Sequence, residues 1–232
     1  MNNNLFQLGN FDGYQVKGRC KIVTDYKHPL EDFSHRFKKP GFGKFMALLD
    51  DPSLINEPDG TRIADAQVPD DYFEKAAFDF TQSNSSGKKE PTYVFDLPDA
   101  LKTASNDGAY LELSEQLHIG TEVRIRWDFL ITEAGYNNFA LNDFALVDIV
   151  DSATHKTIHR EILQQTVDIP AGRWSTGWRH FTWRSPVQTK ATIRIAVCNG
   201  YLFSETIPSH SSQQNASRSF PSGLLVDCIN VA

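Results

Sequence analysis

An Asn-Asp pair interrupts an alternating apolar stretch, NNFALNDFALVDIVD, at residues 137–151. Glu133 ends the preceding apolar stretch, and Asn142 and Asp143 open the next one, so a hairpin-like connection would bring the three side chains together. Their oxygens are hard ligands of the kind that calcium prefers. The same groups could form an Asx-turn and cap a strand end, or, less favoured, a carboxylate pair that hydrolyses a glycosidic bond. Calcium and the cap stay open as equal alternatives.

A second pair of carboxylates lies near the two ends of the sequence. Asp12 precedes the first strand-like stretch, and Asp227 falls inside the last one, GLLVDCINV. In a sandwich whose terminal strands pair, these two side chains could meet. A buried Asp227 would need a partner, because a lone buried charge is costly. The alternation around Asp227 also allows it to face solvent.

Arginines recur on one face of several strand-like stretches. In EVRIRWDFLIT, period-two alternation places Arg124 and Arg126 opposite the apolar residues, and Arg184 and Arg194 hold similar positions in HFTWRS and TIRIAVCN. If these strands share one sheet, its outer face carries all four arginines with Asp128. The planar guanidinium binds carboxylate, sulfate and phosphate, which suits an acidic glycan. Ordinary cross-strand ion pairs are the more favoured explanation.

Two tryptophans, Trp174 and Trp178, lie in the loop-like stretch AGRWSTGWRH. An exposed indole offers a flat apolar face to a sugar ring. Packing of both rings at the edge of a sandwich is the favoured alternative.

Motifs for catalysis, nucleotide binding or zinc binding are absent from the sequence. It contains no GxGxxG before a helix, no Walker loop, no GxSxG and no HExxH. The three cysteines, Cys20, Cys198 and Cys228, lack zinc spacing and favour buried thiols, although one disulfide plus a free thiol also fits. His155 and His159 have a metal spacing only on a helix, whereas their stretch is typical of a hairpin leading into a strand.

Short stretches rich in β-branched and aromatic residues make up most of the chain, each bounded by Gly, Pro, Asn or Asp. They cover residues 13–23, 44–49, 110–114, 122–132, 144–150, 180–185, 192–199 and 223–231. Helical patterns are confined to 70–82 and 96–105, and long loops are expected at 50–71 and 204–222. The pattern therefore predicts an all-β antiparallel sandwich with at most one or two short helices.

Length and composition favour one globular domain over residues 1–232. The hydrophobic content of 40% with 16 Phe excludes a disordered chain, and the net charge of −6 argues against non-specific nucleic-acid binding. The sequence shows no signal-peptide pattern and no stretch apolar enough to span a membrane, so we expect a soluble chain. Sequons at Asn84 and Asn215 matter only in a glycosylating secretory pathway.

Three stretches resemble motifs of a known family. LGNFDGYQVKG is similar to an N-G-x-F-E opening, and LSEQLHIGTEVRIRWDFLITEAGYNNFALNDFALVDI to a block with F-L-T-x-E before N-D-F-A-F-V. SGLLVDCINV is similar to a closing S-G-L-L-[IV]-D-x-[IV] strand. Together they resemble jelly-roll carbohydrate-binding modules and bacterial cell-surface β-sandwich domains. In the binding modules, the acidic residue of the opening motif and the Asp of the closing strand often hold calcium, which the resemblance carries to Asp12, in place of the usual Glu, and Asp227.

The sequence as a whole predicts a single jelly-roll domain that binds carbohydrate, including acidic polysaccharide, without cleaving it. The predicted ligand-binding residues are Trp174, Trp178, Arg124, Arg126, Arg184 and Arg194, and the predicted calcium ligands are Asp12, Asp227, Glu133, Asn142 and Asp143. The alternatives are a structural or adhesive module that binds protein partners and, less favoured, a polysaccharide-degrading enzyme using Glu133 and Asp143. The resemblance implies a secreted or cell-surface location.

Overall fold

A computed structural model describes residues 6–27, 37–50, 81–83, 89–91, 103–131, 143–170, 173–202 and 222–232. These residues form β1 (Gln15–Lys17), β2 (Cys20–Val23), β3 (Met46–Leu49), β4 (Thr81–Ser83), β5 (Lys89–Pro91), β6 (Thr103–Leu117), β7 (Glu122–Leu130), β8 (Phe144–Asp151), β9 (Thr157–Gln165), the 3₁₀ turn η3 (Thr166–Asp168), β10 (Arg179–Arg184), β11 (Thr189–Leu202) and β12 (Gly223–Val231). Within the described ranges, no helix is long and apolar enough to cross a membrane.

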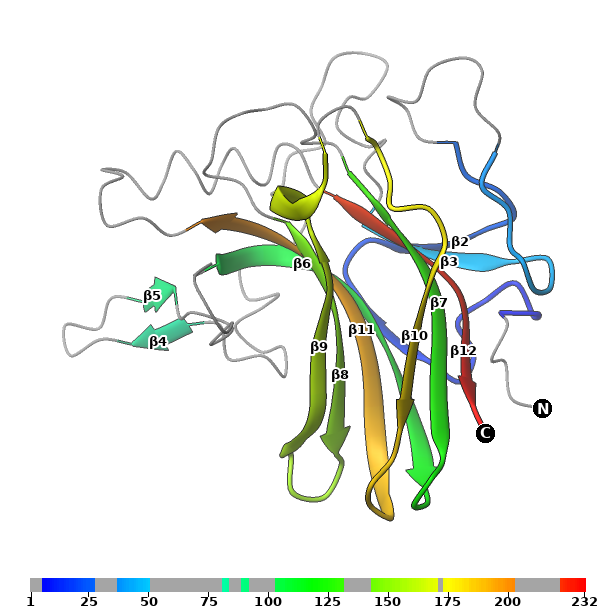
Figure 1. Ribbon diagram of the computed structural model, residues 1–232, viewed down its shortest axis with the longest axis vertical. Coiled ribbons are helices and arrows are strands. Elements are labelled where there is room, and N and C mark those ends of the chain that lie inside the picture. Colours follow the sequence, from blue (N-terminus) through cyan, green and yellow to red (C-terminus); the bar gives the residue numbers. More distant parts are fainter. Residues whose placement is uncertain are drawn as a thin grey trace.

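Two five-stranded antiparallel sheets pack face to face (Figure 1). Sheet A has the order β1-β6-β11-β8-β9, and sheet B has the order β10-β7-β12-β3-β2. Successive strands such as β6 and β7, or β10, β11 and β12, alternate between the sheets, while β4 and β5 pair separately. The all-β sandwich prediction is confirmed. A single domain spanning 1–232 stays a prediction.

One apolar core fills the space between the two sheets. Alternate residues of β7, including Val123, Ile125 and Phe129, point inward, and Ile193 and Ile195 of β11 belong to the same buried cluster. The period-two alternation seen in the sequence therefore corresponds to the two faces of each strand. The same rule places the intervening residues of β7 and β11 on the outer faces of sheets B and A.

Several elements predicted from the sequence differ in detail from the strands of the structure. The stretch 13–23 divides into β1 of sheet A and β2 of sheet B, because Gly18 has a φ of 84° and turns the chain between them. The predicted hairpin around His155 is confirmed by the β8–β9 pairing. The helical predictions lie mostly outside the described residues, but residues 81–82 belong to β4 and 103–105 to β6, so they are wrong there.

The three cysteines are free thiols. Cys198 and Cys228 are buried in strands, as the apolar patterns around them predicted. Cys20 is partly buried in β2, and burial raises the pKa of its thiol to about 12. The predicted loops 50–71 and 204–222, together with the sequons at Asn84 and Asn215, lie outside the described residues except at Asp50 and Ser222.

Candidate functional site

The predicted basic face forms in part. Arg124, Arg126 and Asp128 of β7 and Arg184 of β10 all lie on the outer face of sheet B. Arg194 belongs to β11 of sheet A, so the prediction that it joins them is wrong. Strand alternation assigns a side chain to a face but not to a sheet, and the chain crosses from sheet B to sheet A between β10 and β11.

Arg194 takes part in a row of alternating charges across the outer face of sheet A. It forms ion pairs with Glu112 of β6 and Asp148 of β8, and its guanidinium carbon lies 5.0 Å from the centre of the Tyr110 ring. Arg160 of β9 donates to both oxygens of Asp148 at 3.1 and 3.0 Å. Arg194 and Asp148 are buried. We call Glu112, Arg194, Asp148 and Arg160 the charge ladder. Because these charges pair with one another, the ladder is better suited to stabilising the four strands that carry it than to binding a ligand.

Arg124 and Arg184 share one carboxylate at the lower end of sheet B's outer face. Both pair with Glu122, and Arg184 Nε donates to Glu122 Oε2 at 3.0 Å. Desolvation acts to raise the pKa of Glu122, but the hydrogen bonds from the two arginines outweigh it and the pKa is lowered. The arginine side chains are 62% and 72% exposed. Two exposed guanidiniums on one carboxylate leave a net positive charge with free donor capacity.

Exposed polar side chains connect this end of the sheet to Arg126. His180 and Thr182 of β10 pair in register with Arg126 and Arg124, and Asn230 of β12 pairs with Arg124. His180, Thr182 and Asn230 are exposed. We call the row of His180, Thr182, Arg124, Asn230 and Arg184 the polar strip.

Arg126 itself is held in an ion pair with the fully buried Asp227 of β12. The same carboxylate oxygen, Asp227 Oδ2, accepts a hydrogen bond at 2.9 Å from the backbone N–H of Gly41. The Arg126 guanidinium carbon also lies 4.1 Å from the centre of the Trp178 ring. The structure therefore brings Arg126, Asp227 and Trp178 together, although the sequence placed Asp227 in a separate predicted site.

Gly41 belongs to a segment that crosses sheet B on its outer side. Residues 37–45, which we call the strap, lead directly into β3 and run at the right of Figure 1 as its light-blue trace. Lys38 exchanges two backbone hydrogen bonds with Tyr26, and its Nζ donates to Asp128 Oδ2 at 2.6 Å and Ser175 Oγ at 2.7 Å. The strap is thus attached to the sheet through Asp128 and Asp227.

The strap brings a second aromatic ring to Arg126. The centre of the Phe42 ring lies 5.9 Å from the guanidinium carbon of Arg126, and Phe42 is 51% exposed. Trp178 is partly buried against the apolar patch under the strap, which contains Met46 and Leu48. We call Phe42, Arg126 and Trp178 the aromatic–arginine surface. Sequence reasoning missed Phe42 and Lys38; the stretch KKPGFGKF, in which glycines flank an aromatic residue, was the available signal.

Trp174 lies further along the same edge of sheet B. Its carbonyl accepts a hydrogen bond at 2.9 Å from the Ile131 N–H, and the side chain is partly buried. Ser175 bridges to Leu130, which continues the β10 edge alongside β7. Packing at the sandwich edge, the alternative favoured from the sequence, agrees with this burial. A ligand role for Trp174 stays a prediction.

Of the five predicted calcium ligands, the structure describes Asp12, Asp143 and Asp227. Asp12 is exposed in a local turn in which Asn10 Nδ2 donates to its carboxylate at 2.9 Å. Asp227 is buried, and its Oδ2 faces a guanidinium and a backbone N–H, which are donors and not the oxygen ligands that calcium needs. Calcium at Asp227 stays a prediction. Among the described residues, no group of three or more His, Cys, Asp or Glu side chains is placed to hold a metal ion.

Asp143 caps the start of the closing strand. It is fully buried, and its Oδ2 accepts a hydrogen bond at 2.9 Å from the Ser222 N–H, one residue before β12. The Asn-Asp interruption therefore joins the start of β8 in sheet A to the start of β12 in sheet B. Glu133 and Asn142 lie outside the described residues. A calcium ion at these three residues stays a prediction.

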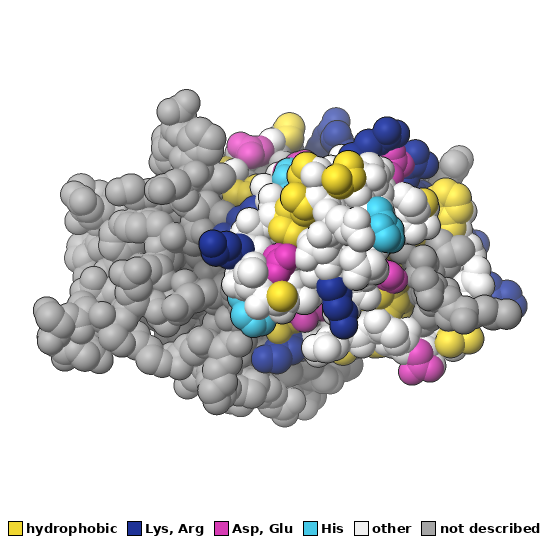
Figure 2. Space-filling model, turned by 90° about the horizontal axis from the view of Figure 1, so that it is seen from below, with side chains coloured by type: hydrophobic (Ala, Val, Ile, Leu, Met, Phe, Trp, Pro, Cys, Tyr) yellow, Lys and Arg dark blue, Asp and Glu magenta, His cyan; other side chains and the backbone are white. Residues whose placement is uncertain are grey.

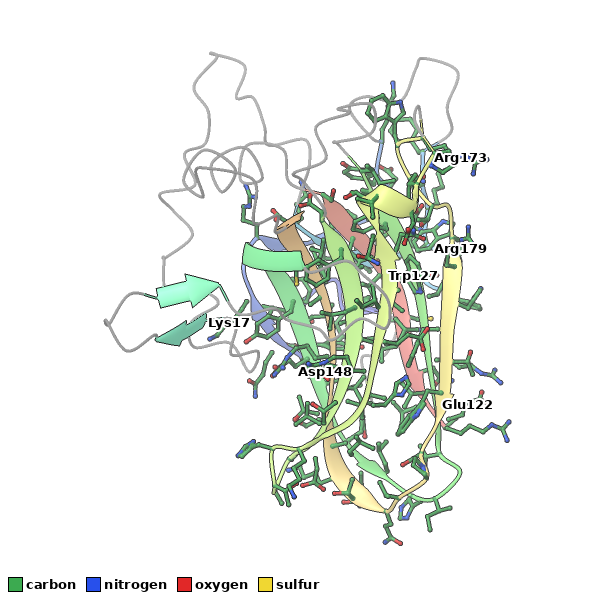
Figure 3. All side chains as sticks on the ribbon, turned by 60° about the vertical axis from the view of Figure 1, so that its left-hand side comes forward. Lys17, Glu122, Trp127, Asp148, Arg173 and Arg179 are labelled. Atoms are coloured by element: carbon green, nitrogen blue, oxygen red, sulfur yellow. The ribbon has the colours of Figure 1, made fainter. Side chains whose placement is uncertain are left out.

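The two sides and the lower end of the molecule differ in character. Figure 3 shows Asp148 on the sheet A side, away from Glu122 and Arg179 on the β10 side. Figure 2, seen from below, shows basic, acidic, His and apolar side chains interspersed at the end where the hairpin turns lie. Exposed Ile119 and Val187 lie in turns of this end. On the outer face of sheet B, Arg126 lies beside the rings of Trp178 and the exposed Phe42.

Solved structures similar to this chain include carbohydrate-binding modules, the family that the sequence resembles. TmCBM61 in complex with beta-1,4-galactotriose has a TM-score of 0.41 and 10% identity, over 100% of this chain and 96% of that chain. The CBM22-2 xylan-binding domain of Xyn10C from Paenibacillus barcinonensis has a TM-score of 0.36 and 8% identity, over 98% and 95% of the two chains.

An enzymatically active domain is also similar. The bacteriophage CBA120 tailspike protein 4 domain has a TM-score of 0.40 and 9% identity, over 100% of this chain and 21% of that chain. With all these TM-scores below 0.5, the likenesses add no argument to what the geometry of this chain shows. No family model matches the chain, and no curated protein matches it.

Proposed function

We propose that this chain is a non-catalytic carbohydrate-binding module whose ligand lies along the outer face of sheet B. The observation that carries the proposal is the aromatic–arginine surface, in which Phe42 is half exposed beside the Arg126–Trp178 stack. Sugar rings pack their C–H faces on such flat apolar rings, while neighbouring polar groups bind the hydroxyls. The sequence motifs that resemble carbohydrate-binding modules support the same reading.

The polar strip extends this surface into an elongated one. Arg184 lies six positions after Trp178, and along a strand this spacing corresponds to about 20 Å. The exposed His180 and Thr182 lie between them, with Arg124 alongside. An aromatic platform at one end and hydrogen-bonding side chains along the strands suit a chain of several sugar units.

The charge of this surface favours an acidic polysaccharide. Arg124 and Arg184 share a single carboxylate, Glu122, and the strap carries the exposed Lys39 and Lys44. This local positive charge lies on a chain whose net charge is −6. Guanidinium groups bind carboxylate and sulfate through paired hydrogen bonds.

The carboxylates of this face support binding and not hydrolysis. Asp128 and Asp227 are fully buried, and each is paired with a cation. Glycoside hydrolysis needs two carboxyl groups that flank the bond to be cleaved. A secreted or cell-surface location and an adhesive role stay predictions.

The first test is a glycan array with the purified chain, followed by affinity gels containing galactan, xylan, a polyuronate or a sulfated polysaccharide. Phe42→Ala should weaken binding of any retained sugar by about tenfold, since it removes the aromatic platform. Val167→Ala, an exposed apolar position after β9 of sheet A, is the matched control and should bind as the wild type does.

Arg124→Ala separates the acidic preference from general sugar binding. It should weaken a uronate or sulfated ligand selectively, whereas Arg179→Ala, an exposed arginine that pairs with the inward-facing Trp127, should not. Equal losses for neutral and acidic ligands would refute the acidic preference. A blank array, or a Phe42→Ala variant with unchanged binding, would refute the proposed site and favour a protein-interaction module.

A further inference from the structure

The strap is attached to sheet B at two buried carboxylates from neighbouring strands. Asp128 of β7 and Asp227 of β12 are both 0% exposed, on the face that the strap covers. A buried carboxylate is strongly destabilising unless it is hydrogen-bonded and paired with a positive charge. Each carboxylate therefore needs a nearby cation and hydrogen-bond donors, and in both cases the strap supplies one of these groups.

At the first attachment, the cation comes from the strap. Lys38 Nζ reaches Asp128 Oδ2 at 2.6 Å and Ser175 Oγ at 2.7 Å, and the Lys38 side chain is only 12% exposed. The other carboxylate oxygen, Asp128 Oδ1, accepts a hydrogen bond at 3.2 Å from Thr176 Oγ1. Asp128 is thus satisfied entirely by groups of this chain.

At the second attachment, the cation comes from the sheet and the strap supplies its backbone. Arg126 pairs with Asp227, and Gly41 N–H donates to the same oxygen at 2.9 Å. A Cβ atom at Gly41 would collide with the Arg126 guanidinium. Glycine therefore lets the strap lie directly on this ion pair without displacing the guanidinium.

The two attachments determine where Phe42 sits. Phe42 follows Gly41 immediately, and Lys38 is three residues before Gly41, so the backbone on the N-terminal side of Phe42 is held at both points. After Phe42 the chain enters β3 within four residues. Little freedom is left for the ring to move away from Arg126 and Trp178.

We propose that Lys38 and Arg126 are positioning residues that lock the strap and set Phe42 beside Trp178 without any metal ion. This inference rests on the proposed function, because it explains how that ligand surface is built. At Asp227, to which the sequence resemblance assigned calcium, the positive charge comes from Arg126. Ligand binding at this surface is accordingly independent of calcium.

The test measures hydrogen exchange of the Gly41 amide by NMR in the full chain without ligand. The amide should be protected in the wild type, equally in calcium and in chelator. Lys38→Met keeps most of the side-chain stem and removes the charge, and should speed Gly41 exchange by roughly tenfold or more. Lys38→Arg should restore protection, and Lys39→Met, an exposed neighbour on the strap, should leave it unchanged.

The sugar selected by the array is then titrated into the same proteins. Lys38→Met should weaken binding about as much as Phe42→Ala does, with the wild-type Kd unchanged by chelator. Two results would overturn the inference whatever the array shows. One is protection of the Gly41 amide that depends on calcium, which is measured on the wild type alone. The other is a Gly41 exchange rate that does not change in Lys38→Met. Loss of protection in Lys38→Met, in a chain that binds no glycan, would support the lock and refute the proposed function.

Discussion

The outer faces of the two sheets both carry buried arginine–carboxylate pairs, but they are assembled in different ways. On sheet A, Glu112, Arg194, Asp148 and Arg160 are direct neighbours in the strand register. On sheet B, the partners of Asp128 and Asp227 include strap residues 90 and 186 positions away along the chain. The network on sheet A forms between strands that pair with one another. The network on sheet B forms only when the strap packs on the sheet.

This difference separates a structural face from a candidate binding face. The charges of the sheet A ladder pair with one another, and its central residues Arg194 and Asp148 are buried, whereas the strap of sheet B leaves Phe42 half exposed and the polar strip open to solvent. Binding sites are commonly carried by loops placed on a rigid scaffold. We therefore expect mutations in the ladder to act on stability, and mutations around the strap to act on ligand affinity.

Arg194→Leu should have the largest effect on stability. Its removal leaves Glu112 without its partner and weakens the neutralisation of Asp148, and loss of one partner from a buried pair costs about 3–5 kcal/mol. The free energy of unfolding in urea measures this loss. Arg184→Leu, an exposed arginine on sheet B, is the control, and an equal loss there would contradict the distinction between the two faces.

Asp128→Asn should destabilise the chain by less, about 1–3 kcal/mol. The amide keeps a hydrogen bond to Thr176 but loses the charge that Lys38 satisfies, and the freed ammonium can turn towards solvent. The same urea series measures the change. A loss as large as that of Arg194→Leu would show that the strap is as tightly coupled to the fold as the ladder.

The β8–β9 turn should add an acid-sensitive contribution on the sheet A side. The hydrogen bond from Thr189 and those from Thr154 and Ala153 lower the pKa of Asp151 to about 2. A lowered pKa means that this stability is present above the unfolded value near 4 and is lost as pH falls towards 2. Melting temperatures between pH 5 and pH 2 should fall less steeply in Asp151→Asn; parallel curves would contradict the assignment.

Glu122→Gln should have the smallest effect on stability. The arginines that it pairs with are exposed, and exposed ion pairs are weak and screened by salt. The variant should nevertheless strengthen binding of an acidic polysaccharide, because both guanidiniums are released. Weaker binding in an affinity gel would show that Glu122 orients them for the ligand.

Several features of the molecule were predictable from the residues. Alternation in β7 predicted which side chains enter the core, and the closing stretch predicted β12 with its bounds at 223 and 231. The cap formed by Asp143 was one of three alternatives that the residue types allowed. The helical pattern at 81–82 failed because those residues pair as a strand, and pairing partners are not visible in local periodicity.

Sequence by itself determined the faces: period two follows from the backbone geometry of each strand, so Arg124, Arg126 and Asp128 had to share one side of β7. Tertiary structure alone decided the sheets and the strap. Arg194 lies apart from the other arginines because the chain crosses between sheets after β10, and Asp227 pairs with Arg126 because β7 and β12 are neighbours. Such contacts join residues far apart in the chain, and only the closed fold brings their charges within bonding distance.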